Sequence, residues 1–102
     1  MKYFIVEGVF NDPVPVPREE RAELLAGHKE FVARGLSAGS VLCAGPKVEG
    51  SGGFIILRAE SREALDEYLN TDPHLQSGVS YFNITEFNPV DRQDCVSDWA
   101  ER

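Results

Sequence analysis

His28 is the residue of this chain whose setting most clearly suggests chemistry. It lies in a helix expected over residues 18–34. Residues three or four positions apart share one face of a helix, and those around His28 are apolar: Leu24, Leu25, Phe31 and Val32. A buried imidazole needs a hydrogen-bond partner, and an imidazole can gain and lose a proton near neutral pH. His28 is therefore a candidate acid–base group, and its partner decides its role.

Other residues that bind metals or act as nucleophiles give weaker signals. His74 lies in a polar turn, so we expect it to be exposed. Cys43 lies in an apolar segment and is expected to be buried, whereas Cys95 lies in a polar tail, so no disulfide is indicated. His28, Asp72 and His74 could bind zinc by residue type, but their spacing does not match a three-ligand motif. We therefore predict no metal and no cofactor.

The composition and charge of the chain limit the kinds of partner that it is expected to bind. The chain has 102 residues, 42% of them hydrophobic, and a net charge of -7. Its ten basic residues form no stripe, which argues against nucleic acid and against an anionic membrane surface. No apolar run approaches the roughly 20 residues that a membrane-spanning helix needs. We expect a cytoplasmic protein.

Apolar runs, helical periodicity and the positions of glycine and proline divide the chain into strands and helices. We expect strands at residues 2–10, 40–44, 54–57 and 79–87 and helices at residues 18–34 and 62–70. Gly35 is expected to cap the first helix, and residues 47–53 to form a hairpin loop. Residues 1–89 are expected to form one domain. Residues 90–102 form a polar tail that is either disordered or docked on a partner subunit.

The order β-α-β-β-α-β predicts an α+β, ferredoxin-like fold, in which two helices cover one face of a four-stranded antiparallel sheet. The strands at residues 2–10 and 54–57 are apolar on both faces. A monomer would expose the uncovered face as an apolar patch. We therefore expect a homodimer that packs sheet against sheet, the dimeric α/β-barrel arrangement.

Several short motifs, taken in order, resemble those of the YciI-like (YCII-related) family. They are His28 on the first helix, Gly35-Leu36, Ala44-Gly45-Pro46, Gly52-Gly53-Phe54-Ile55-Ile56, Glu63-Ala64, Thr71-Asp72-Pro73 and Gly78-Val79. Each motif is short, and the specificity comes from their order and spacing. The proline-rich segment 11–17 and the tail after Pro89 fall outside the resemblance.

The resemblance implies a fold related to muconolactone isomerases and a His–Asp pair in a cleft. Carried onto this chain, the pair is His28 and Asp72. An aspartate that accepts from one imidazole nitrogen leaves the other free to move a proton. Gly45 and Pro46 are expected to line the pocket. Tyr68 could donate a hydrogen bond to a developing oxyanion, or it could be an ordinary core tyrosine.

The function implied by this resemblance is that of a cofactor-independent lyase or isomerase acting on a small molecule. The family includes a dehydrochlorinase that acts on a chlorinated hydroquinone. The alternative is a non-catalytic dimeric domain that binds a small ligand or a partner, in which Asp72 caps the turn that follows it and His28 is a core residue. A monooxygenase of the same fold is a third, weaker alternative.

Overall fold

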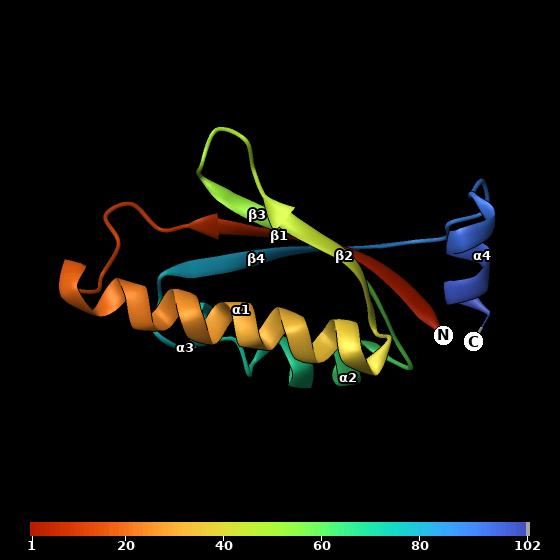
Figure 1. Ribbon diagram of the computed structural model, residues 1–102, viewed down its shortest axis with the longest axis horizontal. Coiled ribbons are helices and arrows are strands. Elements are labelled where there is room, and N and C mark those ends of the chain that lie inside the picture. The colour runs from red at the N-terminus through yellow and green to blue at the C-terminus, as the bar shows by residue number, and fades with distance from the viewer. Residues whose placement is uncertain (102) are drawn as a thin grey trace.

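The computed structural model describes residues 1–101, which form a four-stranded sheet with helices against one face (Figure 1). Among these residues, no helix has the length and apolar character needed to cross a lipid bilayer. In chain order the elements are β1 (Lys2–Phe10), the 3-10 helix η1 (Arg18–Glu20), α1 (Arg21–Ala38), β2 (Val41–Pro46), β3 (Gly52–Ala59), α2 (Arg62–Leu69), α3 (Pro73–Gln76), β4 (Ser80–Phe87) and α4 (Asp94–Ala100).

The sheet has the strand order β2-β3-β1-β4, and each neighbouring pair is antiparallel. The two central strands, β1 and β3, come from opposite ends of the first β-α-β-β run. This is the ferredoxin-like arrangement, so the predicted fold class is confirmed. The first strand begins and ends at the predicted residues, and the second helix ends one residue earlier than predicted.

The hydrophobic core lies between the sheet and helices α1 and α2. Alternate residues of a strand point to the same face, and the inward-facing residues of the central strands are the large apolar ones near their middle. The fully buried cluster comprises Phe4, Val6, Phe31, Val41, Ile55, Leu57, Leu65 and Leu69. This cluster fixes the position of α1 over the sheet.

Helix α1 extends beyond its predicted end, because Gly35 lies inside the helix. The helix ends before Gly39, which has the left-handed backbone conformation (φ 80°) typical of a capping glycine. Gly35 is buried, and a Cβ atom there would collide with the Tyr68 hydroxyl and the Val41 side chain. The predicted cap was wrong because this glycine makes room for α2 and β2 and does not form a turn.

The hairpin between β2 and β3 is tighter than predicted. Gly45 and Pro46 belong to β2, and Gly52 and Gly53 belong to β3, so the connecting turn spans only residues 47–51. Pro46 pairs with Gly53 at the outer edge of the sheet. A proline is tolerated there because an edge strand needs hydrogen-bond donors on one side only.

The C-terminal segment folds onto its own chain, which corrects the expectation of a disordered or partner-docked tail. Trp99 is only 4% exposed, and its indole N–H donates to the Gly39 carbonyl at 2.7 Å. The Tyr3 hydroxyl donates to the Ala100 carbonyl at 2.7 Å, and the Arg58 guanidinium lies 5.4 Å from the centre of the Trp99 ring. Together these contacts dock the short helix α4 on the sheet, with the indole N–H satisfied.

The sheet face opposite α1, α2 and α3 carries apolar side chains that are partly open. Phe54 is 45% exposed and Tyr81 is 46% exposed. Cys43, which was expected to be buried, is also exposed. The register of β2 shifts between Val41 and Cys43, so Val41 occupies the inward position in place of the cysteine.

Candidate functional site

A cavity of about 300 Å³ lies between α1 and the sheet, beside the core. Its origin can be traced in the inward-facing rows of the two central strands. Beyond Phe4 and Val6, the next inward position of β1 is Gly8, and the inward position of β3 beside Ile55 is Gly53. Gly8 and Gly53 are register partners. Both rows therefore lose their side chains at the same level, which leaves open space under α1.

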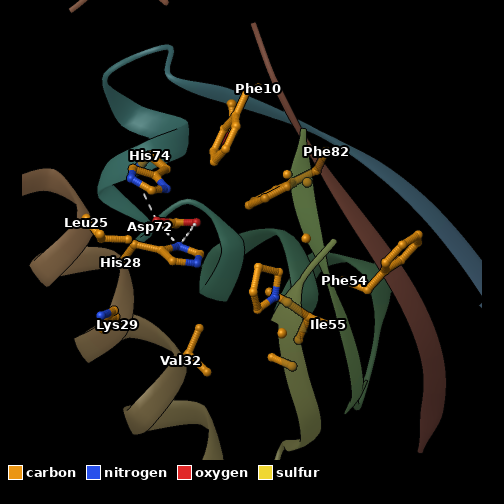
Figure 2. Close-up of a pocket in the computed structure, with 17 residues that line it drawn as sticks. Phe10, Leu25, His28, Lys29, Val32, Phe54, Ile55, Asp72, His74 and Phe82 are labelled. Atoms are coloured by element: carbon orange, nitrogen blue, oxygen red, sulfur yellow. Dashed lines mark hydrogen bonds and ion pairs between the residues drawn. The ribbon is translucent and has the colours of Figure 1, made fainter. Parts of the chain in front are cut away.

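The cavity has apolar walls and a cluster of polar groups on one side (Figure 2). Phe10 and Phe82 approach it from the sheet, and Leu25 and Val32 approach it from α1. The polar and charged residues that border it are His28, Lys29, Asp72, His74 and Ser80. A cavity of this size and lining suits a small molecule that has an apolar body and a few polar atoms.

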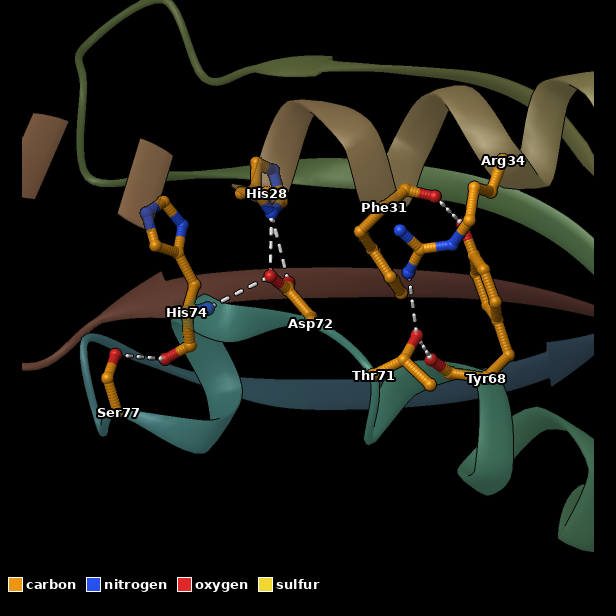
Figure 3. A network of polar contacts seen from close by, with 8 residues as sticks. All are labelled: His28, Phe31, Arg34, Tyr68, Thr71, Asp72, His74 and Ser77. Carbon is orange, nitrogen blue, oxygen red and sulfur yellow. Dashed lines mark hydrogen bonds and ion pairs between the residues drawn. The ribbon is translucent and has the colours of Figure 1, made fainter. Parts of the chain in front are cut away.

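His28 and Asp72 form a hydrogen-bonded pair in the wall of this cavity (Figure 3). Nδ1 of His28 lies 2.9 Å from Oδ2 and 3.0 Å from Oδ1 of Asp72. The Asp72 side chain is completely buried, whereas 28% of the His28 side chain is exposed. An ionised carboxylate can only accept, so the neutral imidazole must carry its hydrogen on Nδ1. This tautomer leaves Nε2 as a free proton acceptor.

A close contact between α1 and α3 brings this pair together. Gly27 precedes His28, and Pro73 follows Asp72. A Cβ atom on Gly27 would lie 2.8 Å from Cγ of Pro73, a distance that would force the two elements apart. The absence of a side chain at Gly27 therefore allows α3 to approach α1, and the imidazole meets the carboxylate as a result.

Asp72 also caps α3. The sequence left open whether this side chain pairs with His28 or caps the turn that follows it, and in the structure it does both. Oδ1 of Asp72 accepts a hydrogen bond from the backbone N–H of His74 at 3.0 Å. A carboxylate has enough lone pairs for several donors. The cap fixes the orientation of the carboxylate, and the carboxylate in turn orients the His28 ring.

His74 is buried beside this pair, which corrects the prediction that it is exposed. Only 7% of the residue is accessible. Its ring stacks on the His28 ring, with 4.6 Å between ring centroids and 13° between ring planes. The sequence reads as a polar turn, but α3 is pressed against α1 and the end of β1, where Phe10 contacts His74 edge-on.

The surroundings of His74 make its imidazole harder to protonate. Burial lowers the pKa of His74, and the nearby positive charge of His28 lowers this pKa further, while the Asp72 carboxylate partly opposes both effects. Two protonated imidazoles stacked face to face would repel each other. The arrangement therefore favours a neutral His74 ring.

The remaining predicted site residues divide into two groups. Gly45 and Pro46 border the cavity, as expected. Tyr68 is not among the residues that border it. The Tyr68 hydroxyl donates to the Phe31 carbonyl at 2.7 Å, and the ring stacks on Phe31. Tyr68 packs against the core cluster, and burial raises its pKa to about 12. The geometry gives no support to the predicted substrate-binding role.

The residues that create the cavity were missed by sequence reasoning. Gly8 and Gly53 interrupt two apolar strands at inward positions, and this signal was present in the sequence. Its meaning depended on the strand register, which places the two glycines opposite each other. Phe10 and Phe82 were read as ordinary strand residues, although they form part of the cavity wall.

His28, Asp72 and His74 resemble a metal-binding cluster, since one ligand-type atom from each lies within 4.8 Å of the others. Two features oppose shared coordination. Nδ1 of His28 is already engaged by the carboxylate. The two rings are nearly parallel, and because each nitrogen lone pair lies in its ring plane, parallel rings do not point at one common ion. The contacts that the structure shows within this cluster are hydrogen bonds to Asp72 and the stacking of the two rings.

Comparison with known proteins agrees with this fold. A family model described as the YCII-related domain matches residues 1–88. A similar solved structure is that of 5-chloro-2-hydroxyhydroquinone dehydrochlorinase from Burkholderia phenoliruptrix AC1100, in complex with 2,5-dihydroxybenzoquinone. It superposes with a TM-score of 0.67 at 17% sequence identity, over 84% of this chain and 93% of the other. A search of curated proteins found no match.

Proposed function

The chain belongs to the YCII-related family, and from that premise we propose that it is a small-molecule lyase or isomerase in which His28 and Asp72 transfer a proton without a cofactor. The observation that carries this proposal is the geometry of His28. Its Nδ1 is held by a buried carboxylate, and its ring borders a cavity large enough for a small molecule. The dehydrochlorinase with the same fold supports elimination chemistry as one form of this activity.

In the proposed reaction, Nε2 of His28 takes a proton from a carbon next to a carbonyl group. The electron pair of the broken C–H bond moves toward the carbonyl and forms an enolate. In an elimination, these electrons form a carbon–carbon double bond as the leaving group departs with its bonding pair. For a chlorohydroquinone in its keto tautomer, the proton that His28 takes is that of a ring hydroxyl, the oxygen electrons form the second carbonyl, and chloride leaves the sp3 ring carbon with its bonding pair. In an isomerisation, His28 returns the proton to a different carbon. Asp72 stabilises the imidazolium that exists between the two steps.

The experiment is a turnover assay of the parent protein and two site variants. The substrate tested first is 5-chloro-2-hydroxyhydroquinone, with chloride release as the readout. His28→Gln should lower the rate by about 100-fold or more, the usual range for loss of a general base. Asp72→Asn should lower it less, because it removes the orienting charge and leaves Nε2 in place. Tyr68→Phe, outside the cavity, serves as the control that keeps the parental rate.

Two results would contradict the proposal. One is a folded His28→Gln protein that turns over substrate as fast as the parent. The other is a parent protein that binds carbonyl and phenol compounds in the cavity but converts none of them. The second result would favour the non-catalytic binding domain, an alternative that the α3-capping role of Asp72 also supports.

We also propose that the chain forms a homodimer through the open face of the sheet. Phe54 and Tyr81 on this face remain nearly half exposed in the single chain, and burial of such side chains drives association. Light scattering should give a dimer mass for the parent protein. Phe54→Asp combined with Tyr81→Asp should shift that mass to the monomer value, whereas an unchanged dimer would exclude this face as the interface.

A further inference from the structure

We propose that His74 is a second functional imidazole, which hydrogen-bonds an oxygen atom of the molecule bound in the cavity while His28 handles the proton. This inference rests on the proposed function, because it assigns a ligand contact within the same cavity. It adds a residue that was predicted from its polar turn to be exposed to solvent. It also defines which atoms a ligand of the cavity needs.

The first observation is that the His74 ring is buried but has no hydrogen-bond partner within residues 1–101. The backbone N–H of His74 donates to Asp72, and its carbonyl accepts from the Ser77 hydroxyl, so both bonds involve main-chain atoms. Within the same residues, no fully buried side-chain nitrogen or oxygen lacks a partner. The ring nitrogens must therefore reach open space, and the ring borders the cavity (Figure 2).

The second observation is that the ring is held in place. Its main chain is fixed by the Asp72 cap. One face of the ring lies against His28, at 4.6 Å between centroids, and Phe10 meets the ring edge-on at 6.1 Å and 83°. A polar group that is fixed in advance loses little conformational entropy when it forms a hydrogen bond. A buried imidazole held this firmly, with its nitrogens free, is suited to ligand binding.

The third observation concerns charge. The groups near His74 that can carry charge are His28 from α1 and Asp72 before α3, and Lys29 borders the same cavity. Burial and the charge of His28 keep the pKa of His74 below its ordinary value. A neutral imidazole has one N–H donor and one acceptor nitrogen. His74 can therefore still donate to a carbonyl oxygen after His28 has accepted a proton, and the face of its neutral ring lies against the imidazolium.

The spacing of the two rings restricts the ligand. The centroids of the two rings lie 4.6 Å apart and the ring planes are nearly parallel, so nitrogens of both rings can contact neighbouring atoms of one small molecule. The site therefore fits compounds in which the acidic proton and a carbonyl or hydroxyl oxygen lie on adjacent carbons. Negative charge that develops on this oxygen would be stabilised by the His74 N–H.

The test uses two matched variants of the full chain. His74→Phe keeps an aromatic ring that can stack on His28 but removes both nitrogens. His74→Gln keeps a donor and an acceptor but removes the aromatic ring. The probe is 2,5-dihydroxybenzoquinone, and its affinity is measured by calorimetry. Nitrogen-15 spectra of the His28 ring serve as a control that the Nδ1–H tautomer, and hence the pair with Asp72, is intact in both variants.

We expect His74→Phe to bind the probe about fivefold to tenfold more weakly than the parent, the loss expected for one hydrogen bond. His74→Gln should stay within about twofold of the parent, because the amide restores the bond. Equal affinity of the Phe variant and the parent, with the His28 signals unchanged, would overturn the role of His74. An equal loss in both variants would also overturn it, since the ring packing would then be what matters.

The two proposals fail in distinguishable ways. If the parent binds the probe and His28→Gln abolishes turnover, but His74→Phe changes nothing, the inference on His74 alone is wrong. If the parent protein does not bind the probe at all, the proposed cavity function is wrong for this class of ligand, and the role of His74 is overturned with it.

Discussion

The two ends of the interface between α1 and the sheet use the same strands and the same inward-facing rows, yet one end is filled and the other is hollow. At the filled end, Phe4 and Val6 are completely buried. At the hollow end, Gly8 contributes no side chain, and His28 borders the space left beneath α1. The difference shows that a change in side-chain size along one row is enough to turn a packed core into a cavity without changing the fold.

The largest effect should come from removing a ring at the filled end. Phe4 is 1% exposed, so Phe4→Ala should lower the free energy of unfolding by about 3–5 kcal/mol. Phe10, on the same face of β1 but 39% exposed, should lose about 1 kcal/mol or less when changed to alanine. Urea denaturation of both variants measures the contrast. Similar losses at the two positions would mean that the ends are packed alike.

Filling the hollow end should remove binding without removing stability. In Gly8→Val, the new Cβ atom would lie 3.4 Å from the edge of the Phe82 ring, and the valine methyl groups would occupy the cavity. Loss of a strand glycine contributes about 0.5–1 kcal/mol to stability, which should offset the tighter contact. We expect ligand affinity to fall more than about tenfold, a loss of at least ~1.4 kcal/mol. Unchanged affinity would show that the ligand binds elsewhere.

The close contact between α1 and α3 at the hollow end can be tested at Gly27. Alanine is the better helix former by about 1 kcal/mol, but a Cβ atom there would meet Pro73 at 2.8 Å. We expect Gly27→Ala to be destabilising by about 1 kcal/mol, since overpacking outweighs propensity. It should also weaken the His28–Asp72 bond, with a change in the His28 nitrogen-15 signals. Ala26→Gly, at a neighbouring exposed position, calibrates the propensity effect alone. A stabilised Gly27→Ala protein would contradict the close approach.

The smallest effect concerns pH. The pKa of folded His74 lies below its ordinary value of 6.5, so below about pH 6.5 the unfolded chain binds more protons than the folded one. Stability should therefore fall as pH is lowered from 7.5 to 5, and His74→Phe should lose less over this range. Urea midpoints at the two pH values measure the difference. Equal losses in parent and variant would indicate that His74 titrates alike in both states.

Much of the fold could be predicted because it depends on local patterns. Residues 2–10 carry a continuous apolar run and residues 62–69 an apolar helical periodicity, each bounded by turn or capping residues, and their observed ends lie within one residue of expectation. The role of Gly35 was predicted wrongly because glycine occurs in helices in two settings. It can cap the end of a helix, or it can make room inside a helix where another element approaches closely. The sequence alone does not distinguish these uses, since the approaching Tyr68 lies far along the chain.

The candidate site could be predicted only in part, because some of its features depend on contacts between residues far apart in the chain. The family motif indicated His28 and Asp72, and their side chains meet in the structure. The burial of His74 and the alignment of Gly8 with Gly53 depend on contacts between distant segments. A polar turn gives no local sign of the surface against which it packs.

The hydrogen bond between Tyr3 and Ala100 has a practical consequence. It ties the beginning of β1 to α4, so both ends of the described chain emerge at the same end of the molecule (Figure 1). The cavity lies at the other end of β1, near Gly8 and Phe10, about 20 Å away at ~3.3 Å per strand residue. An affinity tag, a fluorescent fusion or a surface linker could therefore be attached at either terminus and leave the cavity mouth unobstructed.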